Sequence, residues 1–157
     1  MLKPQKIVFL VSNLSAGGAE RVAATLCNDW SSRGIDVNLI TTSKKICNSF
    51  YALGSQVSLL SLGNGGGLAW AENLLRLIKL RRMILKIDPD IVVSFLPNVN
   101  IAAILSTAFT GIPCVIGERS DPVEQPIGWI WYMACRLLYR FADVVTVQTD
   151  SVANRIG

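Results

Sequence analysis

Hydrophobic and polar positions alternate along this chain with two different periods. Short apolar runs rich in β-branched residues, such as residues 7–11 and 91–96, are typical of strands buried on both faces of a sheet. Between these runs, apolar residues recur at helical spacing, as Ala19, Val22 and Ala23 do. We expect strands at 7–11, 37–41, 57–62, 91–96, 114–117 and 144–148, and helices from 19 to a stop at Gly34, at 70–87, at 100–109 and at 127–141.

This order of elements predicts the fold class. Apolar strands that alternate with helices form a parallel sheet, and right-handed connections place the helices on both of its faces. The sequence therefore predicts one α/β domain over residues 1–157, with a Rossmann-like, doubly wound and mostly parallel sheet.

Ligands of such sheets bind outside the carboxyl ends of the strands. The first strand leads through Asn13 to Gly17 and Gly18, and then into a helix that carries Arg21. Backbone amides at a helix N-terminus point the same way, and the helix dipole adds to their partial positive charge. Because two glycines leave room for an anion, the pattern predicts a phosphate site. A tight turn that binds no ligand explains the same glycines.

Polar side chains also gather after the fourth and fifth strands. These residues are Asn98, Asn100, Glu118, Arg119, Ser120 and Asp121. Only 17% of the chain is charged, so a carboxylate beside an arginine at a strand end is a candidate for chemistry. The alternative is an exposed salt bridge between Glu118 and Arg119, worth about 0–1 kcal/mol.

Missing residue types narrow the chemistry. The chain has no histidine, which excludes Ser-His-Asp and Cys-His catalysis and a His-ligated zinc site. Its four cysteines show no CxxC spacing, and we expect buried, reduced thiols. The first turn lacks the third glycine of a dinucleotide-binding fingerprint, and the Gly-Lys-Ser/Thr of a P-loop does not occur.

The chain is apolar and mildly basic, with 51% hydrophobic residues and a net charge of +4, which by itself does not indicate nucleic acid binding. Arg76, Lys79, Arg82 and Lys86 lie roughly on one face of helix 70–87, and helix 127–141 combines aromatic residues with arginines. Such helices suit an anionic membrane surface. The alternatives are an ordinary solvated face and an aromatic stripe that is simply core. Without a signal peptide or a bilayer-length apolar run, we expect a cytoplasmic protein, peripheral at the inner face of the cell membrane.

Four stretches together resemble one enzyme family. They are Ser-Ala-Gly-Gly-Ala-Glu-Arg-Val at 15–22, Asp-Pro-Asp-Ile-Val-Val-Ser-Phe at 88–95, Val-Ile-Gly-Glu-Arg-Ser-Asp-Pro at 115–122 and Ala-Asp-Val-Val-Thr-Val-Gln-Thr at 142–149. In this order they resemble the start of the family 4 glycosyltransferases. The resemblance implies the N-terminal half of a GT-B fold and a retaining, metal-independent hexosyltransferase without a cofactor. Its nucleotide-sugar co-substrate would be bound mainly by a C-terminal domain that this chain lacks, so we expect residues 1–157 alone to be inactive.

The same resemblance assigns roles to the candidate residues. Gly17 and Gly18 would approach the donor diphosphate. Glu118, about where many members carry a histidine, would orient acceptor or sugar hydroxyls, and Arg119 would pair with an anionic group or fix Glu118. The implied acceptor is a glycan or a polyprenyl-linked glycan of bacterial surface polysaccharide synthesis. A non-catalytic module that brings an acceptor or a membrane to a separate catalytic subunit is the alternative. The residues expected in the acceptor-side cleft are Asn13, Arg21, Asn98, Asn100, Ser120 and Asp121.

Overall fold

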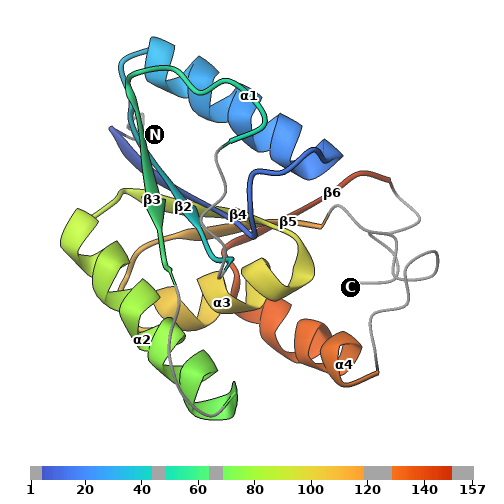
Figure 1. The fold of residues 1–157 in the computed structure, drawn as a ribbon. Coiled ribbons are helices and arrows are strands. Elements are labelled where there is room, and N and C mark those ends of the chain that lie inside the picture. Colours follow the sequence, from blue (N-terminus) through green and yellow to red (C-terminus); the bar gives the residue numbers. More distant parts are fainter. Residues whose placement is uncertain (1–4, 44–48, 64–68, 119–128, 150–157) are drawn as a thin grey trace.

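A computed structural model of the chain describes residues 5–43, 49–63, 69–118 and 129–149. Six strands form one sheet in the order β3-β2-β1-β4-β5-β6, and every pair of neighbours is parallel (Figure 1). This confirms the predicted Rossmann-like α/β class. The strands are β1 (Lys6–Val11), β2 (Asp36–Thr41), β3 (Val57–Ser61), β4 (Ile91–Phe95), β5 (Cys114–Glu118) and β6 (Val144–Val147).

The strand order reverses between β1 and β4, which are neighbours although two strands separate them in sequence. Ile7 of β1 pairs with Val37 of β2 on one side and with Ile91 of β4 on the other. In an open parallel sheet, the crevice for ligands lies beyond the carboxyl ends of the strands at this reversal. The carboxyl ends of β1, β4 and β5 therefore form the edge where a site is expected.

Helices cover the two faces of the sheet unequally (Figure 1). Helix α1 (Gly18–Ser32) packs on one face, against a cluster that includes Phe9 and Leu39. On the other face, a cluster with Val8 and Leu10 packs against the remaining helices. Those helices are α2 (Ala69–Ile87), α3 (Pro97–Thr107) and α4 (Trp129–Leu138), and α4 continues into the 3-10 helix η1 (Tyr139–Phe141).

Helix α3 begins at Pro97 and not at Asn100, so the sequence prediction of a loop at 97–99 is wrong. Proline fits the first helical position because its ring fixes φ and its missing N–H would be unpaired there anyway. Leu96 precedes it with φ 77° and ψ 142°, a conformation that residues with a side chain rarely adopt. This strained residue turns the chain from β4 directly into α3 at the carboxyl edge.

The cysteines that the structure describes, Cys27, Cys114 and Cys135, are buried free thiols, as predicted. Burial raises the pKa of the Cys27 thiol to about 12 and that of Cys114 to about 11, so neither is a ready nucleophile. Cys47 lies outside the described residues. Within the described ranges, no cluster of Cys, Asp and Glu could hold a metal ion, and no helix is long and apolar enough to cross a bilayer.

Candidate functional site

A short loop joins β1 to α1 at the carboxyl edge, and its own side chains hold its shape. Asn13 accepts hydrogen bonds through Oδ1 from the backbone N–H of Ser15, at 2.9 Å, and from the Ser15 hydroxyl. This is the side-chain turn that asparagine favours in loops. Leu14 between them is fully buried in the core beneath α1. The loop is therefore anchored by a leucine and closed by an asparagine before it reaches the glycines.

The first turn of α1 is open for an anion. Gly17 is the N-cap, has extended backbone with φ −161°, and makes no side-chain capping bond, while its carbonyl accepts from Arg21 N at 3.0 Å. A Cβ added to Gly18 would have no described heavy atom within 4 Å, beyond its own helix and chain neighbours. A side chain at this position would therefore enter open space at the first turn of α1. The geometry fits the predicted phosphate site, which no bound ligand tests.

Glu20 is a residue of this loop that the sequence interpretation overlooked. Its carboxylate folds back over Gly17, so close that a Cβ on Gly17 would clash with Oε2. An acid at the third helical position interacts favourably with the helix dipole and is the usual partner in a capping box. An acidic residue at the third position of a predicted helix was the sequence signal that could have identified Glu20. The negative charge of this carboxylate would repel an anion bound at the α1 N-terminus.

The segment between β2 and β3 supports the glycine loop from outside. Tyr51 donates from its hydroxyl to the carbonyl of Gly17 at 3.1 Å, and Phe50 N donates to the carbonyl of Leu14 at 2.8 Å. Asn28 of α1 holds the same segment, because its amide donates to Ala52 O and its Oδ1 accepts from Gly54 N. The sequence gave no sign of these contacts, since they join residues more than twenty positions apart.

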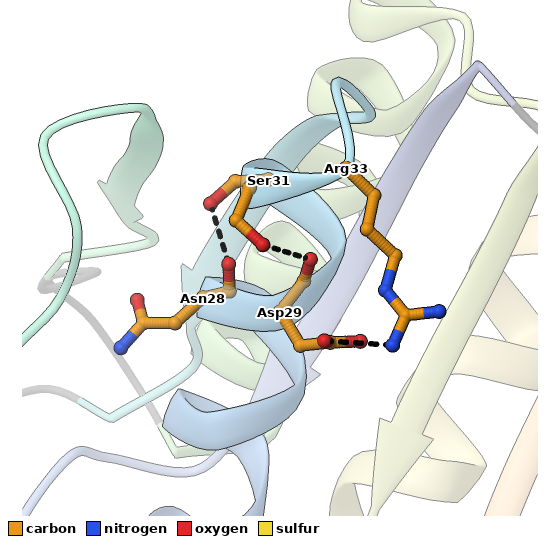
Figure 2. A network of polar contacts seen from close by, with 5 residues as sticks. Asn28, Asp29, Ser31 and Arg33 are labelled. Atoms are coloured by element: carbon orange, nitrogen blue, oxygen red, sulfur yellow. Dashed lines mark hydrogen bonds and ion pairs between the residues drawn. The ribbon is translucent and has the colours of Figure 1, made fainter.

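Asn28 also takes part in the polar contacts near the C-terminal end of α1 (Figure 2). There the Ser31 hydroxyl donates to the Asn28 carbonyl at 3.1 Å, and Arg33 pairs with Asp29 at 2.8 Å. The pair spans four positions with both side chains well exposed, an arrangement worth about 0.3–0.5 kcal/mol. These contacts lie at the C-terminal end of α1, whereas the glycine loop lies at its N-terminal end.

Glu118 ends β5 as a buried carboxylate. It is 5% exposed, and its Oε2 accepts a hydrogen bond of 2.7 Å from the hydroxyl of Tyr139. The preceding residue must be small, because a Cβ on Gly117 would lie 2.5 Å from Cδ1 of Phe95. The Phe95 ring packs on this glycine and meets Phe9 edge-on at a centroid distance of 4.9 Å. The packing of β5 against Phe95 of β4 thus fixes the position of Glu118.

The structure separates the other predicted residues by their surroundings. Asn98 is exposed in the first turn of α3, whereas Asn100, two residues further along, is completely buried and hydrogen-bonded. Arg21 is exposed on α1. Arg119, Ser120 and Asp121 lie outside the described residues, so the structure does not place the second half of the predicted Glu-Arg-Ser-Asp site.

A groove between α2 and α3 opens near Asn98. It has a volume of about 560 Å³, with Thr42, Arg76 and Asn98 among its polar lining residues and leucines such as Leu77 and Leu80 along its apolar wall. Arg76 is held there by donating to the carbonyls of Gly63 and Thr42. The groove thus brings an amide and a guanidinium next to an apolar wall, on the α2–α3 side of the sheet.

The predicted basic face of α2 divides into two groups. Arg76 and Lys79 donate to backbone carbonyls at the ends of β2 and β3, with Lys79 Nζ 2.5 Å from Leu62 O. The neighbouring Arg81 donates to the carbonyls of Ser106 and Ala108 at the end of α3. Arg82 and Lys86 are exposed. Two of the four predicted cations therefore bind the domain itself, which the helical spacing alone does not reveal.

Comparison with known proteins identifies the family. A model of the glycosyl transferase 4-like domain matches residues 17–157. The chain belongs to this glycosyltransferase family. It is 30% identical over 150 residues to a curated enzyme of Campylobacter jejuni, GalNAc-alpha-(1->4)-GalNAc-alpha-(1->3)-diNAcBac-PP-undecaprenol alpha-1,4-N-acetyl-D-galactosaminyltransferase. That match covers 93% of the chain and 41% of the enzyme, so the chain spans less than half the length of this relative.

Solved structures of low sequence identity share the fold. Sucrose-phosphate synthase from Thermosynechococcus elongatus superposes with a TM-score of 0.75 at 12% identity, over 97% of this chain and 44% of the synthase. MurG of Acinetobacter baumannii gives a TM-score of 0.66 at 17% identity, over 95% of this chain and 42% of MurG. Anabaena HepE in complex with UDP and glucose gives a TM-score of 0.67 at 15% identity, over 98% of this chain and 41% of HepE. The Rossmann-like domain thus has a GT-B-type fold, as expected.

Proposed function

We propose that the chain is the N-terminal, acceptor-side domain of a retaining glycosyltransferase that moves a hexose or N-acetylhexosamine from a nucleotide-sugar to a glycan or lipid-linked acceptor. One observation carries this proposal. A buried carboxylate, Glu118, and an open helix N-terminus at Gly18 stand at the same edge of the sheet, on either side of β4. Two strand spacings of about 4.8 Å separate β1 from β5, so their carboxyl ends lie about 10 Å apart with β4 between them.

In the reaction, the bond from the anomeric carbon to the acceptor oxygen forms on the face from which the diphosphate leaves. The first-turn amides of α1 would stabilise the charge that develops on the departing diphosphate. Glu118 would orient a hydroxyl of the acceptor or of the sugar, since an ionised carboxylate accepts hydrogen bonds and a fixed one accepts them in one place. Neither role calls for a histidine or for a metal.

The acceptor is proposed from the relative and from the groove. The Campylobacter enzyme is named for an acceptor in which a glycan is joined through diphosphate to undecaprenol. A groove with apolar walls and polar groups at Asn98 and Arg76 suits an acceptor that has both lipid and polar parts. We assign this protein to the synthesis of such lipid-linked bacterial glycans, at the cytoplasmic face of the membrane.

The test is transfer by the full-length protein that contains these residues, with labelled UDP-sugars as donors and a synthetic polyprenyl-diphosphate glycan as acceptor. We expect labelled product with retained anomeric configuration from the full-length protein and none from residues 1–157. The isolated fragment should bind a nucleotide-sugar more weakly than about 1 mM, an affinity of about −4 kcal/mol. Micromolar binding to the fragment in calorimetry would contradict the division of the donor site between two domains.

Contact with an anionic membrane is part of the same proposal. The outer side of α2 exposes Leu74, Leu75 and Leu85 together with Arg82 and Lys86, a combination that favours the interface of charged lipids. The double variant Arg82→Glu and Lys86→Glu should weaken sedimentation with anionic vesicles and leave folding intact, since neither residue has a structural role described above. Equal sedimentation with neutral and anionic vesicles would remove the membrane from the proposal.

A further inference from the structure

A chain of hydrogen bonds crosses the core and ends on Glu118. The Ser94 hydroxyl donates to Oδ1 of Asn100 at 2.8 Å, Asn100 Nδ2 donates to the Tyr139 hydroxyl at 3.2 Å, and that hydroxyl donates to Glu118 Oε2 at 2.7 Å. The four residues come from β4, α3, η1 and β5, and none is more than 5% exposed. Hydrogen bonds at such depth are sheltered from water and polarise one another.

Each donor in this chain points toward the carboxylate. A carboxylate only accepts hydrogen bonds, so the Tyr139 hydroxyl donates its single proton to the bond with Glu118. The same hydroxyl oxygen must then accept the hydrogen bond from Asn100. Burial, more than the nearby Glu118 charge, raises the pKa of Tyr139 above its usual range, so the phenol keeps that proton at any physiological pH. Asn100 is fixed in turn, because its amide also donates to the carbonyl of Gly117 at 3.2 Å.

The fold explains why a residue so far along the sequence reaches this edge. Helix α4 connects β5 to the parallel strand β6, so it runs back along the sheet, opposite to the strands. Side chains on a helix lean toward its N-terminus. Tyr139, just past the end of α4, therefore leans toward the carboxyl edge, where Glu118 lies. Helical spacing groups this tyrosine with the aromatic stripe of 127–141, yet it is 4% exposed and faces the core.

We propose that Tyr139 is the positioning residue of the candidate site: its hydroxyl, fixed by Asn100 and Ser94, sets the orientation of the Glu118 carboxylate. The kinetic part of this inference rests on the proposed function, whereas the contact itself does not. With Tyr139 bound to Oε2, the other carboxylate oxygen keeps a defined direction. Loss of this bond would remove one of the contacts that fix the carboxylate, and Glu118 would then orient a substrate hydroxyl less well.

The experiment compares Tyr139→Phe with wild type in the full-length protein. Phenylalanine keeps the ring and removes only the hydroxyl. In infrared difference spectra, where subtraction of a Glu118→Gln spectrum isolates the Glu118 band, we expect the antisymmetric carboxylate stretch to shift. We expect kcat for sugar transfer to fall about tenfold or more, with the donor KM unchanged, as for a lost hydrogen bond to a charged group.

Two further variants make the result decisive. Ser94→Ala removes the far end of the chain, and we expect a smaller shift of the same band in the same direction. It also replaces Tyr139→Phe as the test if that variant does not fold. Thr107→Val is the matched control, because Thr107 is a buried hydroxyl at the other end of α3 that bonds α3 carbonyls and the Cys114 thiol and has no described contact with Glu118. It should lower stability without moving the band or kcat.

An unmoved carboxylate band in Tyr139→Phe, or a kcat that falls no further than in Thr107→Val, would overturn the inference. A wild-type protein that transfers no sugar would overturn the proposed function instead. In that case a shifted band would still support the orientation of Glu118 by Tyr139, so the two failures are distinguishable.

Discussion

Gly18 and Gly117 both lie at the carboxyl edge of the sheet, one at the start of α1 and the other near the end of β5, but the domain needs them for different reasons. A Cβ on Gly18 would have no described neighbour within 4 Å, whereas a Cβ on Gly117 would meet the buried ring of Phe95 at 2.5 Å. Gly117 is therefore required by packing inside the domain. Gly18 is not, which makes a ligand or a facing domain the natural reason for its missing side chain.

The surroundings of the two glycines differ in the same way. Beside Gly18, the loop is closed by a local bond from Ser15 to Asn13 and is supported from the surface by Tyr51 and Phe50. Beside Gly117, Glu118 is held by Tyr139, which is 21 positions away, and Tyr139 by Asn100, which is 39 positions away. One half of the edge is a loop with open space beside Gly18, and the other is a carboxylate fixed by buried residues of the core. The comparison predicts that substitutions at the two places separate ligand binding from folding and chemistry.

The largest effect is expected at Glu118. Glu118→Gln keeps the shape and still accepts from Tyr139 but removes the charge, so the protein should fold as the wild type does. We expect kcat/KM of the full-length enzyme to fall about 10²-fold or more, about 2.7 kcal/mol of lost transition-state stabilisation. Steady-state kinetics beside a thermal melt would measure both. Wild-type turnover would reduce Glu118 to a structural residue and leave the glycine loop as the candidate site.

Gly117→Ala should come next and should damage both folding and activity. The added methyl group cannot fit unless Phe95 or the end of β5 moves, and such overpacking costs about 1–3 kcal/mol. Any movement of β5 also displaces Glu118, so we expect kcat to fall together with the free energy of unfolding. Urea denaturation with the transfer assay tests this. An unchanged melt would mean that Phe95 has more freedom than its edge-on contact with Phe9 indicates.

The same contrast shows how far the sequence could lead. The strands and the glycine loop were predictable because their signals are local: apolar runs, helical spacing, and glycines that follow directly on a strand. Glu118 was identifiable as a carboxylate at a strand end. That Tyr139 and Asn100 hold it was not, because the contact depends on how α3 and α4 pack on the sheet. The start of α3 at Pro97 was not predictable either, because it depends on the unusual positive φ of Leu96.

Helical spacing was also insufficient to decide what a charged side chain does. Arg76 and Lys79 share a face with Arg82 and Lys86 in sequence, yet the first two end on backbone carbonyls of the domain. Long basic side chains reach several ångströms along the surface, so their partners are set by neighbouring loops. The helical spacing of the residues carries no information about where those loops lie. Arg82 and Lys86 are therefore the cations that a membrane test should change.

Gly18→Ala should separate binding from stability. Since the Cβ enters open space and alanine suits a helix better than glycine, the free energy of unfolding should stay unchanged or rise by at most about 1 kcal/mol. The methyl group would still stand before the first-turn amides, so the donor KM of the full-length enzyme should rise about tenfold, an energy of about 1.4 kcal/mol. Gly18→Val should raise it further. An unchanged donor KM in both variants would assign the loop to a turn that binds no ligand.

The smallest effect is expected at Tyr51, outside the glycine loop. Tyr51→Phe removes the hydroxyl that donates to Gly17 O at 3.1 Å and leaves the ring against Phe50. Because this bond is only partly buried, the free energy of unfolding should fall by about 0.5–1.5 kcal/mol. The donor KM should rise slightly, since the carbonyl that Tyr51 holds belongs to the N-cap of α1, while kcat should not change because Glu118 is held independently. A fall in kcat as large as that of Tyr139→Phe would show that the two halves of the edge are coupled, and the division between an open loop and a core-fixed carboxylate would then be wrong.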